Sequence, residues 1–100
     1  MSNPTQERTD LANKVINSRF ATTKFKAGYD LNDVDDFLDT VARQLRDEPR
    51  AEVIAKTIKN AAFRQTKWRD GYNSEQVDRF LDELVKTLRT WQDPDLNLLA

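Results

Sequence analysis

Apolar residues recur at intervals of three and four in two long segments of the chain. The spacing is 4-3-4 in the first segment and 4-3-4-3 in the second. The residues are Val34, Leu38, Val41 and Leu45, and then Val77, Leu81, Leu84, Leu88 and Trp91. This spacing is typical of helices that pack on another helix along one stripe. Two heptads are too short for an extended coiled coil, so the pattern predicts paired helices inside a compact bundle.

Both long helices have a recognisable start. Asp30 and Asn73 carry the short polar side chains that cap helix N-termini, and Asp33 and Gln76 follow three residues later. This arrangement predicts a variant of the capping box at each start, in which the two side chains bind each other's backbone N–H groups. The second long helix is expected to run to about residue 92.

Two shorter helices are expected ahead of the long ones. The first is capped by Thr9 or Asp10 and ends near Phe20. The second begins at Pro49, because proline suits the first turn of a helix, and ends near Phe63. Residues 21–28 and 64–71 show no helical period and are expected to form loops.

The expected fold is therefore all-α. Four helices in a short-long-short-long order form two helix-loop-helix units, packed as a compact bundle with pseudo-twofold symmetry. The predicted divisions are a flexible N-terminus (1–8), a first repeat (9–47), a second repeat (50–91) and a C-terminal tail (92–100). Leu96, Leu98 and Leu99 make the tail leucine-rich. The sequence leaves open whether it folds back on the bundle or serves as a docking surface.

The two units repeat each other at an offset of 43 residues. Residues 15–46 and 58–89 align without a gap and share 13 identities in 32 positions. The most conspicuous shared elements are Gly-Tyr, Val-Asp and Phe-Leu-Asp. One such unit is too small to bury a stable core alone, so the two copies are expected to pack on each other or on another chain.

The amino-acid composition excludes several kinds of catalytic and metal-binding site. The 100 residues contain no cysteine and no histidine, which removes disulfides, thiolate or imidazole metal ligands, a cysteine nucleophile and a histidine general base. Asp35 and Asp39, like Asp78 and Asp82, are four residues apart on one helical face, and are interpreted as partners of the helix dipole and of the basic loops. We expect no enzyme, cofactor or metal. No apolar run approaches a membrane span and the polar start is not a signal peptide, so a soluble cytoplasmic protein is expected.

The formal net charge of −1 hides a segregation of charge. Residues 14–26 hold four basic side chains and no acidic one, and residues 56–69 hold five and no acidic one. Two explanations remain open: compensation of helix dipoles, or basic loops that meet an anionic surface. The near-neutral balance and the sequence pI of about 5.4 argue against nucleic acid as a partner.

Both copies contain the pattern Phe-x-x-x-[basic]-aromatic-[basic]-x-Gly-Tyr-[Asp/Asn]-x-x-x-Val-Asp-x-Phe-Leu-Asp. It resembles the N-terminal domain of the DivIVA family, over residues 9–47 and 50–91. The structural residues of the motif are Gly28, Tyr29, Val34, Phe37 and Leu38 in the first copy, and Gly71, Tyr72, Val77, Phe80 and Leu81 in the second.

The resemblance implies a helical module of bacterial cell division or polar growth that attaches to the inner face of the membrane. Attachment in that family uses an exposed aromatic residue beside a basic one at the loop tip. The matching pairs here are Phe25 with Lys26 and Trp68 with Arg69, and Lys24 and Lys67 would add to the same basic patch. The sequence is compatible with Phe25 and Trp68 as exposed anchors and as buried lid residues.

The sequence departs from that family in two ways. Ala27 and Asp70 lengthen each loop tip by one residue, and no long coiled-coil tail follows the second copy. The resemblance therefore implies an adaptor or accessory factor rather than a self-assembling scaffold. Its expected partners are proteins of unknown identity and an anionic membrane surface, with a homodimer also open. The alternative is a purely structural helical dimerisation or interaction domain with no membrane role.

Overall fold

The computed structural model describes residues 4–24 and 26–91. The predictions made for residues 1–3, for Phe25 and for the tail at 92–100 lie outside the described residues. Four helices and four short strands follow one another along the described chain. They are α1 (Pro4–Ile16), β1 (Thr22–Thr23), β2 (Gly28–Asp30), α2 (Leu31–Asp47), α3 (Ala51–Lys59), β3 (Gln65–Thr66), β4 (Gly71–Tyr72) and α4 (Ser74–Arg89).

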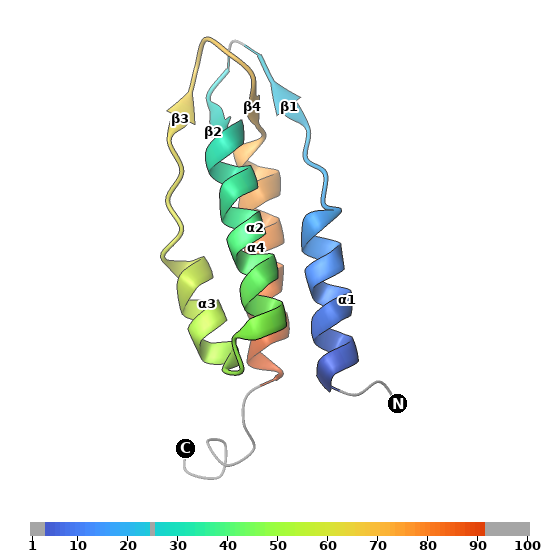
Figure 1. The fold of residues 1–100 in the computed structure, drawn as a ribbon. Helices are drawn as coiled ribbons and strands as arrows, with labels where there is room; N and C mark the ends of the chain where they lie inside the picture. The colour runs from blue at the N-terminus through green and yellow to red at the C-terminus, as the bar shows by residue number, and fades with distance from the viewer. Residues whose placement is uncertain (1–3, 25, 92–100) are drawn as a thin grey trace.

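The two long helices lie side by side and run in the same direction, away from the strands (Figure 1). The helices α1 and α3 flank this pair on opposite sides and run back toward the strands. Each short helix packs on the long helix of its own repeat, α1 on α2 and α3 on α4. The result is a helical bundle with a small sheet at one end.

The prediction of an all-α fold is wrong. Segments 21–28 and 64–71, expected to be plain loops, contribute four strands to one antiparallel sheet in the order β1-β4-β2-β3. At its centre Tyr29 pairs with Tyr72, while Thr22 pairs with Tyr72 and Gly28 with Thr66 at the two flanks. The strands therefore alternate between the repeats, and every strand pair joins one repeat to the other. These strands of two or three residues are too short to show an alternating hydrophobic pattern.

The predicted N-caps of both long helices are confirmed. The Asp33 backbone N–H donates to the Asp30 side chain at 2.9 Å, and the Gln76 N–H donates to Asn73 at 3.0 Å. The return half of each capping box is exchanged between the repeats. The side-chain oxygens of Asp33 and Gln76 accept from the backbone N–H groups of Arg64 and Ala21 instead. Each helix start thus holds the loop of the other repeat.

The short helices differ from their predicted limits. The first begins at Pro4, where the missing proline N–H costs nothing in a first turn, and ends at Ile16 rather than Phe20. The second begins after Arg50, an N-cap with no side-chain hydrogen bond, so Pro49 precedes the helix instead of forming its first turn. The segments between each short helix and its strand are extended links to the sheet.

The core follows the predicted stripes. Val34, Val77, Leu45 and Leu88 are fully buried, and these form two pairs of equivalent positions in the two repeats. Leu38 and Leu81 are buried as well, each 7% exposed. Phe37 and Phe80, expected in the core, are half-buried and pack against its edge. One continuous hydrophobic cluster therefore joins both repeats.

Candidate binding surface

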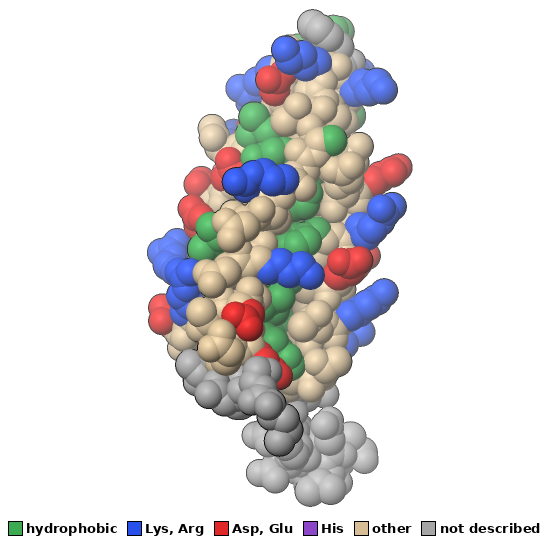
Figure 2. All heavy atoms as spheres, turned by 90° about the vertical axis from the view of Figure 1, so that its right-hand side faces the viewer, with side chains coloured by type: hydrophobic (Ala, Val, Ile, Leu, Met, Phe, Trp, Pro, Cys, Tyr) green, Lys and Arg blue, Asp and Glu red, His purple; other side chains and the backbone are tan. Residues whose placement is uncertain are grey.

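The sheet brings the tips of both loops to the same end of the molecule. We call residues 24, 26–27 and 67–70 the loop end. The β1–β2 and β3–β4 connections lie beside each other beyond the strands (Figure 1). Basic side chains gather at this end in the space-filling view (Figure 2). The sequence did not establish whether the two loops point the same way, and the strand pairing shows that they do.

The loop end exposes the basic and aromatic groups that the sequence singled out. Lys24, Lys26 and Lys67 are exposed, and Trp68 is 79% exposed. Trp68 is thus not a lid over the bundle. Its counterpart in the first copy, Phe25, lies outside the described residues. A large aromatic ring held in solvent beside lysines is the arrangement expected of a residue that enters another surface.

Arg69 differs from the other basic groups at the loop end. Its guanidinium lies 3.2 Å from the Asp30 carboxylate, although the arginine side chain remains 73% exposed. Asp30 is the buried N-cap of α2, so Arg69 also holds the second loop against the first repeat. The unpaired positive charge of the loop end therefore rests mainly on Lys24, Lys26 and Lys67, which have no ion-pair partner among the described residues.

A second arginine, Arg64, strengthens this hold and was missed from the sequence. Its side chain donates to both carboxylate oxygens of Asp33, at 2.9 and 3.1 Å, and its backbone N–H donates to the same group at 2.9 Å. These hydrogen bonds lower the pKa of Asp33 from 3.8 to about 2. The only available signal was that Arg64 replaces Ala21 at the equivalent position of the first repeat.

The glycines of the motif allow the two central strands, β2 and β4, to approach each other closely. A Cβ on Gly28 would lie 2.8 Å from the Tyr72 carbonyl oxygen, and one on Gly71 would lie 2.9 Å from that of Tyr29. Neither glycine takes the left-handed conformation that glycine allows. The two central strands can approach this closely only because both positions lack a side chain.

The tyrosines of the motif bind across the repeats. The Tyr29 hydroxyl donates to Asp78 of α4, and the Tyr72 hydroxyl donates to Asp35 of α2, both at 2.8 Å. Partial burial, and then the adjacent carboxylate, raises the pKa of each tyrosine above its ordinary value. Asp35 and Asp78 are therefore acceptors for tyrosine, whereas the expected contacts with the basic loops are made by Asp30 and Asp33.

Two aromatic clusters complete the support beneath the loop end. In one, the ring of Phe20 lies 5.6 Å from those of both Tyr72 and Phe80. In the other, the ring of Phe63 lies 5.0 Å from Tyr29 and 5.4 Å from Phe37. Each cluster joins a phenylalanine that precedes one loop to two rings of the other repeat. The loop end is thus fixed to a rigid scaffold rather than carried on free loops.

Comparisons with known proteins give no further guide: no family model, no curated protein and no solved structure matches the chain. Within residues 4–24 and 26–91, none of the helices combines the length and the apolar composition needed to cross a bilayer. The same part of the chain holds no group of three or more histidine, cysteine or carboxylate side chains placed to bind a metal ion.

Proposed function

We propose that the chain is a non-enzymatic, DivIVA-like binding module. In this proposal it acts in the bacterial cytoplasm as an adaptor or accessory factor in cell division or polar growth. The loop end attaches it to the anionic inner face of the membrane, and the helical part binds protein partners.

The observation that carries the proposal is the 79% exposure of Trp68 next to Lys67, with both loop tips at one end. Tryptophan is favoured at the headgroup level of a bilayer, and each Lys or Arg near an anionic leaflet gains about 1 kcal/mol. Two tips that face one way can bind one surface together, so attachment by one tip raises the effective concentration of the other.

The proposal is tested by the fluorescence of Trp68. Replacing Trp91 with Phe leaves Trp68 as the single tryptophan of the chain. Because Trp68 starts in water, its emission should shift to the blue when anionic vesicles are added and should not change with neutral vesicles. High salt should restore the emission of the free protein, because it screens the attraction between the lysines and the lipid. If anionic vesicles produced no shift, the membrane role would be contradicted and the alternative of a structural interaction domain would be favoured. A pull-down would then be used to identify its partner.

Charge reversals supply a matched control. Lys24→Glu with Lys67→Glu changes equivalent positions at the loop end, and vesicle affinity should fall at least about tenfold. Arg43→Glu with Lys86→Glu makes the same change in net charge at equivalent exposed positions on α2 and α4, and should leave affinity nearly unchanged. Equal losses in the two double variants would indicate unspecific attraction by net charge.

A further inference from the structure

An open groove of about 520 Å³ lies along α3 and reaches Arg89 near the end of α4. The helix α3, along which this groove lies, is at the opposite end of the bundle from the strands (Figure 1). Its half-buried apolar lining is Val53 and Ala55, and its remaining lining residues are charged. They are Arg50, Glu52, Lys56, Lys59 and Arg89.

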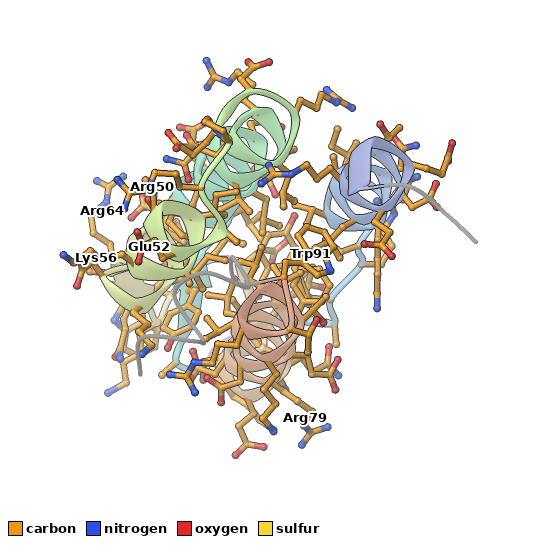
Figure 3. The ribbon with its side chains drawn as sticks, turned by 90° about the horizontal axis from the view of Figure 1, so that it is seen from below. Arg50, Glu52, Lys56, Arg64, Arg79 and Trp91 are labelled. Carbon is orange, nitrogen blue, oxygen red and sulfur yellow. The ribbon has the colours of Figure 1, made fainter. Side chains whose placement is uncertain are left out.

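Most of the positive charge of the groove lacks a partner. Arg50 pairs with Glu52. Among the described residues, the side chains of Lys56, Lys59 and Arg89 make no hydrogen bond or ion pair. Figure 3 shows Glu52 and Lys56 on α3 and Arg50 at its start, on the side of the bundle away from α1. Three free cations beside an apolar strip match an acidic segment that also carries apolar side chains.

The first repeat shows that folding of the helix pair does not require this charge. At the offset of 43 residues, the positions of Arg50, Lys56 and Lys59 are occupied by Glu7, Asn13 and Ile16. The same helix-on-helix packing is thus built with a different surface. Arg89 does have a basic counterpart, Arg46, so it is the basic charge along α3 that is particular to the second repeat.

The chain itself supplies a segment with the matching chemistry. Residues 92–100 contain Asp93, Asp95 and three leucines, and no basic residue. They follow Trp91, which is half-buried and lies under the guanidinium of Arg8, 5.9 Å from the ring centre. The segment therefore starts from a fixed point two residues beyond Arg89, at the end of the bundle where α3 begins.

We propose that residues 92–100 dock in the α3–α4 groove. Nine residues can span about 30 Å, more than the roughly 14 Å length of α3, so the segment reaches the whole groove. Asp93 and Asp95 face the free cations, and the leucines cover Val53 and Ala55. A short tether gives an effective concentration in the millimolar range, so weak contacts are sufficient to hold the segment.

The test uses the full chain and its lack of cysteine. Asn97→Cys provides a single site for a nitroxide spin label, and amide NMR signals report which residues it approaches. Val53 and Lys56 should lose intensity, which returns when the label is reduced. Asp10 and Asn13, at the equivalent positions of α1, should keep theirs. Equal losses in both repeats, or losses only elsewhere, would overturn the proposal.

Charge exchange separates docking from chance proximity. Asp93→Lys with Asp95→Lys should abolish the intensity loss at Val53. Adding Lys56→Asp and Lys59→Asp to that variant should restore it, because the attraction is then reversed in sign but kept. If the intensity loss at Val53 were the same in the native chain and in both variants, charge would not hold the segment. That result would also overturn the proposal.

Discussion

Asp33 and Arg64 show how one side chain can take a role in another repeat. Asp33 was predicted as the third residue of a capping box, a local role that the spacing from Asp30 indicates. Its carboxylate instead accepts three hydrogen bonds from Arg64, 31 residues away. Nothing in the order of residues places 64 beside 33, since that proximity depends on the way the loops cross. The cap could be predicted from the sequence, and its cross-repeat partner could not.

The Asp33–Arg64 contact predicts an acid-sensitive part of the stability. Folding lowers the pKa of Asp33 from 3.8 to about 2, so the stabilisation is complete above about pH 4 and is lost as the pH falls toward 2. Arg64→Ala should therefore make the melting temperature less dependent on pH in this window. Alanine is the native residue at the equivalent position 21.

A matched control for this experiment is Arg79→Ala. Arg79 is exposed, and its side chain has no ion-pair or hydrogen-bond partner among the described residues. Its variant should keep the pH dependence of the native chain. If the Arg64 variant also kept the native pH dependence, the low pKa of Asp33 would not be due to Arg64.

At the scale of elements, sequence patterns predicted the helices and missed the strands. The stripes in α2 and α4 repeat over 17 and 16 residues, long enough for the period of 3.6 to be read. The strands have two or three residues each, and their partners belong to the other copy. A strand this short is specified by its tertiary partner, here through Gly28, Gly71 and the tyrosines beside them, and not by its own composition.

The shared stripe predicts large costs for truncation. Leu38→Ala and Leu81→Ala should each reduce the free energy of unfolding by about 2–5 kcal/mol, because each removes a buried side chain between the repeats. That is a large part of the roughly 5–15 kcal/mol typical of a domain. Chemical denaturation measures the loss. Ile16→Ala, at a position 46% exposed, should cost far less. Similar values for all three would contradict a core built on the stripe.

At the scale of the whole molecule, the two repeats form a single unit. The loop end lies at one end of this unit, and the turn between the repeats lies at the other. Contacts between the repeats include all four strands, both tyrosine–aspartate hydrogen bonds and both aromatic clusters. At the other end Arg8 of α1 donates to the carbonyls of Glu48 and Pro49 in the turn between repeats. Without the other repeat, either repeat would lose all of these contacts.

Cutting the turn between the repeats should therefore not separate them. A protease site inserted between Glu48 and Arg50, once cleaved, should leave two fragments that elute together in a 1:1 ratio. Their melting temperature should rise with protein concentration, because folding now requires association. The uncut insertion variant is the control, and its melting temperature should not depend on concentration. Two fragments that elute apart and melt cooperatively on their own would contradict a shared core.

The alternation of strands between repeats also has a consequence for synthesis on the ribosome. Thr22 and Thr23 pair with Tyr72 and Gly71, so β1 has no partner until nearly fifty further residues have been added. At the usual 5–20 residues per second this takes about 3–10 s. Val34, Leu38 and Leu45 wait in the same way, because each is added 43 residues before its counterpart in the second long helix. Neighbouring ribosomes on one message then carry first repeats with the same exposed stripe, and slower translation of the second repeat would lengthen the time in which two nascent chains can pair with each other.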